Sequence, residues 1–146
     1  MTDIRTVSET FSVSPQLSLD DLAAAAGMGF NTIINNRPDG EAVDQPSSQD
    51  VAAAAEVAGM AYRYLPIVPG QVSESDIREF SDAIAALPRP VLAFCRTGAR
   101  SITLYCLAEA TRQNPGALLE MASAAGFDLG PLRERLEMRA AAKSYR

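Results

Sequence analysis

The chain has 146 residues with 13 basic and 18 acidic side chains, which give a formal net charge of −5, and it contains two cysteines and no histidine. This acidic balance gives no electrostatic footprint for a nucleic acid or an anionic membrane surface. Histidine, the commonest metal ligand and general base, is missing, and the spacing of the two cysteines does not match a zinc site. We therefore expect no metal and no cofactor.

The length fits a single domain, residues 1–146, which should bury about two-thirds of its unfolded surface. The polar start at Met1 gives no sign of a secretory leader, and there is no apolar run of about 18 residues. The sequence therefore predicts a soluble, cytoplasmic chain with no membrane or nucleic-acid partner.

Short apolar strands alternate with amphipathic helices along the chain. Ser18 and Ser73 are each followed by acidic residues, as is typical of a helix N-cap. We expect strands at 11–14 (at a sheet edge), 30–34, 60–68 and 91–94, and helices at 22–26, 51–58, 77–87, 102–112, 118–125 and 132–142. This order predicts an α/β protein with a mainly parallel central sheet flanked by helices.

A cysteine stands at the end of the 91–94 strand, before a polar loop that opens the next helix. Backbone N–H groups in such a loop, together with the positive end of a helix, favour a bound anion and a thiolate. Arg100 can fold back to hold an oxyanion through two parallel hydrogen bonds, and Gly98 lets the backbone close around it. We infer that Cys95 and Arg100 are catalytic and that the anion is bound by Arg96, Thr97, Gly98, Ala99 and Ser101. The alternative is a buried structural cysteine, which is how we interpret Cys106.

A second polar run follows the 30–34 strand. Ligands of parallel sheets bind outside the carboxyl ends of the strands. If this strand lies beside the cysteine strand, then Asn35, Arg37, Asp39 and Glu41 emerge on the same rim as Cys95. Arg37 is the favoured anion contact among them, and an ordinary solvated turn is the alternative.

Residues 5–135 resemble a small bacterial family, the beta-lactamase hydrolase-like protein, phosphatase-like domain. The resemblance rests on the polar run 35–41 and the loop 95–101, together with the segments 13–17, 66–70 and 125–129. The resemblance implies the fold of the cysteine-dependent protein tyrosine and dual-specificity phosphatases. Members of the family are named either as phosphatases or as sulfurtransferases. Some are fused to, or encoded beside, persulfide-oxidising metallo-enzymes, which makes such an enzyme a possible partner.

The sequence departs from the phosphatase pattern, and the departures affect which reaction we expect. That pattern has a histidine before the cysteine and five residues between cysteine and arginine, whereas Phe94 precedes Cys95 and four residues separate it from Arg100. This spacing resembles the six-residue loop of rhodanese-like sulfurtransferases. The phosphatases also take a general acid from an aspartate in the loop that corresponds to 66–71, which contains none.

Our first hypothesis is therefore sulfur transfer. Cys95 would take a sulfane sulfur from thiosulfate or a persulfide and pass it to a thiophilic acceptor, with a small anionic or persulfide molecule as substrate. The alternative is a phosphatase with a Cys95 phosphocysteine intermediate, in which Asp39 or Glu41 supplies the proton. A third possibility is a non-enzymatic anion-binding or sulfur-carrier module.

Overall fold

The fold is built around one five-stranded sheet, seen in a computed structural model that describes residues 3–144. The strand order is β1-β2-β5-β3-β4. The strands are β1 (Arg5–Thr6), β2 (Phe11–Ser14), β3 (Thr32–Asn35), β4 (Ala61–Tyr64) and β5 (Val91–Phe94). β2, β5, β3 and β4 are parallel, and only β1 pairs antiparallel, with β2. The predicted α/β class and mainly parallel sheet are confirmed.

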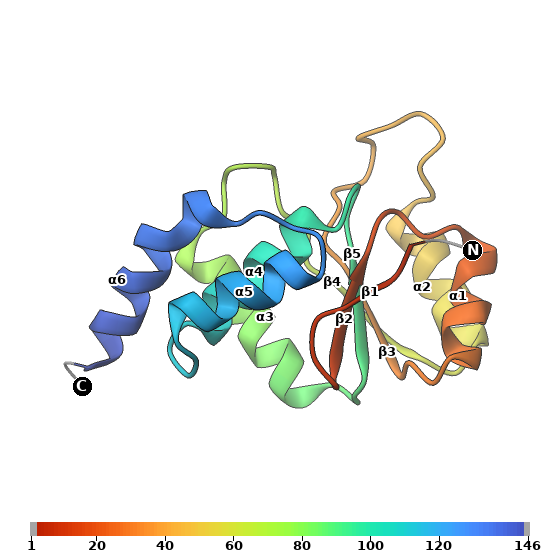
Figure 1. The fold of residues 1–146 in the computed structure, drawn as a ribbon. Helices are drawn as coiled ribbons and strands as arrows, with labels where there is room; N and C mark the ends of the chain where they lie inside the picture. The colour runs from red at the N-terminus through yellow and green to blue at the C-terminus, as the bar shows by residue number, and fades with distance from the viewer. Residues whose placement is uncertain (1–2, 145–146) are drawn as a thin grey trace.

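Helices cover both faces of the sheet (Figure 1). α1 (Leu19–Gly27) and α2 (Ser48–Val57) lie on one face. The other face carries α3 (Glu74–Ala86), α4 (Ala99–Glu109), α5 (Pro115–Ala124), the 3-10 turn η1 (Gly130–Leu132) and α6 (Arg133–Ser144). None of the helices between residues 3 and 144 is long and apolar enough to cross a bilayer.

The helices on both faces of the sheet explain why every residue of β5 is apolar. Val91 and Ala93 pack into the core under α3 and α4, whereas Leu92 and Phe94 pack into the core under α1 and α2. All four residues are at most 1% exposed. A strand buried on both faces needs apolar residues at every position rather than at alternate ones.

Two strand predictions need correction. Phe11–Ser14 is not at the sheet edge, because the two-residue strand β1 pairs outside it. So short a strand leaves no periodic signal in the sequence. The predicted 60–68 strand is confined to Ala61–Tyr64, after which the chain leaves the sheet towards α3. Both N-cap predictions are confirmed, since Ser18 and Ser73 form capping boxes with Asp21 and Asp76.

Three chain segments leave the sheet at one rim. β5 lies between β2 and β3, and Phe94 is in register with Ser14 on one side and Asn35 on the other. The residues that follow these three positions therefore emerge side by side. The expected neighbourhood of the cysteine strand and the Asn35–Glu41 run is confirmed.

Candidate active site

Cys95 is the first residue beyond β5 and lies at the base of the loop that leads into α4. The residue is 0% exposed, and its Sγ accepts a hydrogen bond from the Gly98 backbone N–H at 3.1 Å. Gly98 is the N-cap of α4 and has a φ of 97°, a left-handed conformation that favours glycine. The sulfur therefore faces the N-terminal end of an 11-residue helix, where the dipole favours negative charge. With the loop closed in this way, an anion reaches the sulfur only when the loop or a covering side chain moves.

Arg100 lies in the first turn of α4, and its guanidinium is held from two sides. Nη1 donates to Glu41 Oε2 at 2.7 Å and to the Ile67 carbonyl at 3.0 Å, and Nη2 donates to Glu41 Oε1 at 2.9 Å. These bonds use three of the five N–H groups of arginine. The two that remain, on Nε and Nη2, are parallel and lie along one edge of the planar group, the arrangement that binds a tetrahedral oxyanion.

Arg100 also interacts with Cys95. The hydrogen bond with Glu41 does most to raise the pKa of Arg100, and burial opposes it. The charge of Cys95 and a hydrogen bond with it raise that pKa further. The cysteine and the guanidinium of Arg100 are therefore close enough to interact.

Glu41 lies between two arginines. Besides its two bonds with Arg100, its Oε1 accepts from Arg37 Nε at 3.0 Å. The side chains are 24% exposed for Glu41, 12% for Arg100 and 7% for Arg37. The hydrogen bond from Arg100 lowers the pKa of the Glu41 carboxyl, burial partly offsets this, and the bond from Arg37 lowers it again. Glu41 is therefore ionised at neutral pH.

Arg37 is fixed by neighbours rather than pointing freely into the site. Its Nη1 donates to Gln16 Oε1 at 3.0 Å, and its backbone N–H donates to Asn35 Oδ1 at 2.9 Å. Gln16 belongs to the segment that follows β2, and its backbone N–H donates to the Arg96 carbonyl in the loop after Cys95. The predicted anion contact is thus part of a chain of bonds that links all three segments of the rim.

Asp39, predicted as catalytic, caps a helix. Its Oδ1 accepts from the backbone N–H of Ser48, the first residue of α2, at 2.7 Å, and its own N–H donates to Tyr64 Oη at 2.9 Å. Asp39 is exposed. This placement favours a structural role for the carboxylate.

The other predicted anion-binding residues have different surroundings. Ser101 is fully buried, and its Oγ donates to Asn36 Oδ1 at 2.8 Å. Thr97 is exposed, and its Oγ1 accepts from the Ala99 N–H at 3.3 Å. Arg96 is exposed. Ala99 is the first residue of α4 and offers only backbone to an anion.

Several residues that shape the site were not singled out from the sequence as site residues. Asn36 holds Ser101 and also donates from Nδ2 to the Leu65 carbonyl. Phe127 and the Ser14 carbonyl approach so closely that a Cβ on Gly98 would lie 3.1 and 3.4 Å from them. The contacts of Gln16, Ile67 and Phe127 come from distant parts of the chain, so no local spacing could have predicted them.

Cys106 lies in the core, as predicted, and burial raises the pKa of its thiol to about 12. Tyr64 is half-buried and binds the Asp39 backbone, as given above. Among residues 3–144 there is no group of three or more histidine, cysteine, aspartate or glutamate side chains placed to hold a metal ion.

The fold is that of the protein tyrosine and dual-specificity phosphatases. Its features are a cysteine at the end of a central parallel strand, a loop that closes on a left-handed glycine, and an arginine in the first turn of the next helix. Two solved structures share it. Tk-PTP, in a glycine-to-alanine mutant form, aligns with a TM-score of 0.77 at 17% identity, covering 99% of this chain and 98% of that one. Kinase associated phosphatase, with its catalytic-site cysteine replaced by serine, aligns with a TM-score of 0.73 at 12% identity, covering 100% and 97%.

The chain belongs to the beta-lactamase hydrolase-like protein, phosphatase-like domain family, whose model matches residues 3–112. A crystal structure from Neisseria meningitidis z2491, nma1982, described as a proposed phosphatase, is 33% identical with a TM-score of 0.84, covering 93% of this chain and 97% of that one. The beta-lactamase hydrolase-like protein of Xylella fastidiosa (strain 9a5c) is 37% identical over 136 residues, 92% of this chain. That of Agrobacterium fabrum (strain C58 / ATCC 33970) is 36% identical over 138 residues, 93% of this chain. The chain spans only 32% of the length of each of these two relatives.

Proposed function

We propose that this chain is a cysteine-dependent phosphatase that acts through Cys95. One observation carries the proposal: the Cys95 sulfur accepts from the Gly98 N–H, and the guanidinium of Arg100, held by Glu41 and Ile67, interacts with that cysteine. The family and the phosphatases of the same fold support this activity over sulfur transfer, our first hypothesis.

The reaction has two steps. In the first, the Cys95 thiolate attacks phosphorus, so that an S–P bond forms and the P–O bond to the leaving group breaks. The loop N–H groups and the Nε/Nη2 edge of Arg100 bind the phosphoryl oxygens while charge develops on them. In the second step, water attacks the phosphocysteine, releasing inorganic phosphate and returning the thiolate.

The leaving group receives little help from the described residues. The chain has no histidine, and the segment 65–72 after β4 contains no acidic residue. Asp39 caps α2, and the pKa of Glu41 is lowered by Arg100, so neither carboxyl is poised to donate a proton at neutral pH. We therefore propose aryl phosphates as the substrate class, because a phenolate leaves more readily than an alkoxide.

Sulfur transfer is the second candidate, favoured by one specific observation. Four residues rather than five separate Cys95 from Arg100, which makes a smaller ring. The sulfite or thiolate that leaves in sulfur transfer needs no general acid, which agrees with the surroundings of Asp39 and Glu41.

One pair of assays tests both candidates on the same protein. Phosphate release is measured with para-nitrophenyl phosphate and with glycerol 2-phosphate, and intact mass is measured after incubation with thiosulfate, each with Cys95→Ser as the control. The proposal predicts Cys95-dependent release from the aryl ester, at least about 100-fold faster than from the alkyl ester. A Cys95-dependent gain of about 32 Da with thiosulfate, without phosphate release, would instead establish the sulfur-transfer half-reaction.

A further inference from the structure

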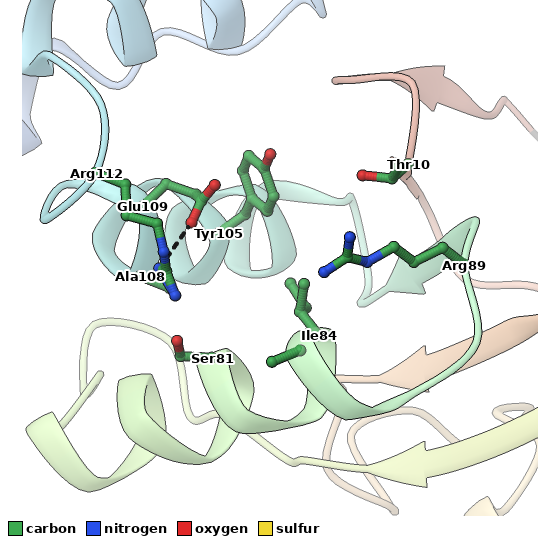
Figure 2. Close-up of a pocket in the computed structure, with 9 residues that line it drawn as sticks. Thr10, Ser81, Ile84, Arg89, Tyr105, Ala108, Glu109 and Arg112 are labelled. Atoms are coloured by element: carbon green, nitrogen blue, oxygen red, sulfur yellow. Dashed lines mark hydrogen bonds and ion pairs between the residues drawn. The ribbon is translucent and has the colours of Figure 1, made fainter.

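Figure 2 shows a cavity lined by residues of α3, α4 and the segments before β2 and β5. Its volume is about 230 Å³, and it lies at the opposite end of the sheet from Cys95. Thr10 and Arg89 line it and stand just before β2 and β5, whereas Cys95 comes after β5. The six residue steps from Arg89 to Cys95 span about 20 Å when extended. The cavity is therefore separate from the candidate active site. Its remaining lining comes from α3, from α4 and from the turn after α4: Ser81, Ile84, Ala85, Tyr105, Ala108, Glu109 and Arg112.

Two guanidinium groups enter the cavity from different elements. Figure 2 shows Arg89 reaching in from the β5 side and Arg112 from beyond the end of α4. Within residues 3–144, Arg89 has no side-chain hydrogen bond or ion pair. Arg112 Nη1 donates to Glu109 Oε2 at 3.1 Å, and Glu109 Oε1 also accepts from Gln113. With one carboxylate against two guanidinium groups, the lining carries a net positive charge in a chain whose net charge is −5.

Neutral donors surround the charged groups. Thr10, Ser81 and Tyr105 each bring a hydroxyl to the lining. The Tyr105 ring is only 5% exposed and stacks on Phe11 with 4.3 Å between ring centroids, so its position is fixed. Burial raises the pKa of Tyr105, and hydrogen bonds with Ser8 and Gln113 partly offset this, so the hydroxyl keeps its proton and is held by those two residues.

The rest of the lining is apolar. Ile84, Ala85 and Ala108 come from the facing surfaces of α3 and α4. An apolar wall between two arginines, with hydroxyls nearby, is an arrangement that binds a small amphiphilic anion. The volume limits the ligand to about the size of one substituted ring.

We propose that this cavity is a second anion site, which binds a small organic oxyanion of the phosphate or phosphonate class. Arg89 and Arg112 hold the oxyanion, the hydroxyl of Thr10 donates to one of its remaining oxygens, and Ile84 packs against its carbon portion. Arg89 contributes most, because its guanidinium has no competing carboxylate. The site does not depend on the proposed phosphatase activity.

Phenylphosphonate tests the proposal, because it has the required head group and ring and is not hydrolysed. The wild-type chain is titrated while its backbone amides are followed by ¹H–¹⁵N NMR. We expect the amides near Arg89 and Arg112 to shift and saturate below about 5 mM. Arg89→Gln should weaken this binding about tenfold or more, and Arg112→Gln should weaken it less. Arg63→Gln, which removes an exposed arginine from β4, is the matched control and should bind as the wild type does.

Separate amides report on the two sites, so failure of one is distinguishable from failure of the other. Shifts around the Cys95 loop alone would overturn the second site, whatever they mean for catalysis. Three further results would also overturn the second site. The chemical shift changes of amides near the cavity could persist unchanged in Arg89→Gln, could rise linearly with ligand concentration without saturating, or could be produced equally by the cation benzylamine.

Discussion

At the scale of single residues, Glu41 does most to fix the candidate active site. Its carboxylate binds the Nη1–Nη2 edge of Arg100 and the Nε of Arg37, and the Ile67 carbonyl takes the other Nη1 hydrogen. These bonds hold the guanidinium of Arg100 in one orientation. We infer that Glu41 is a positioning residue, which acts on substrate through Arg100.

Replacing Glu41 by Gln keeps the size of the side chain and removes its charge. Arg100 then loses two charge-assisted bonds, and we expect kcat on para-nitrophenyl phosphate to fall about 10- to 100-fold with a smaller change in KM. Steady-state kinetics measure this, with partial recovery expected in Glu41→Asp. Glu79→Gln, at an exposed position on α3, is the control. Wild-type kcat in Glu41→Gln would show that Arg100 does not need this partner.

Glu41 also makes stability depend on pH. The pKa of this carboxyl is lowered from its ordinary value of 4.5 by Arg100, so the folded state binds the proton more weakly than the unfolded state does. The stabilisation is therefore fully present above pH 4.5 and is lost as the pH falls through the lower, folded value. Urea unfolding between pH 7 and pH 3 should show a constant difference between wild type and Glu41→Gln above pH 4.5, which shrinks below it. A difference that grows in acid would contradict this assignment.

At the scale of elements, the sequence predicts what depends on local pattern. The β5 strand, the two capping boxes and the glycine that opens α4 each have a signal within a few residues. β1 was missed because two residues carry no period, and Phe11–Ser14 was therefore wrongly placed at the edge. The partners of Arg100 could not be predicted, because Glu41 lies 59 positions away and Ile67 lies 33 positions away. The catalytic roles of Cys95, Arg100 and Asp39 stay predictions.

The turn from β5 into α4 depends on Gly98. An alanine there would adopt a φ of 97° with its Cβ 3.1 Å from Phe127 Cζ and 3.4 Å from the Ser14 carbonyl. Gly59 is a matched control, since it has a φ of 81° and open space around a new Cβ. We expect Gly59→Ala to cost about 1 kcal/mol and Gly98→Ala to cost more and to abolish turnover. Urea unfolding and the aryl phosphatase assay measure both effects; equal losses in the two variants would argue against the close contacts.

At the scale of the whole molecule, the core extends beyond the part that the family model matches. That match ends at residue 112, yet Leu118 and Leu136, from α5 and α6, are both 0% exposed in the same core as Leu104. Arg139 also joins α6 to the Leu107 carbonyl at the end of α4. The two C-terminal helices are therefore part of the folding unit that carries Cys95.

A chain that ends at residue 112 should not fold stably. Such a chain lacks α5 and α6, so the core residues that Leu118 and Leu136 cover become exposed. The lost apolar burial lowers the free energy of unfolding by about 4 to 6 kcal/mol, which is comparable with the total stability of a small domain. Circular dichroism and urea unfolding measure the outcome, with a chain ending at residue 142 as the control that keeps both leucines. A cooperative transition in the 112-residue chain would show that α5 and α6 are accessory.

The central claim is that Cys95 forms a bond to phosphorus during turnover. Acid quenching in the first turnover of para-nitrophenyl phosphate, followed by mass spectrometry of the Cys95 peptide, tests it most directly. The account predicts a transient gain of about 80 Da on Cys95, absent in Cys95→Ser and lost as turnover ends. Phosphate release that survives in Cys95→Ser, or an adduct on any other residue, would contradict it.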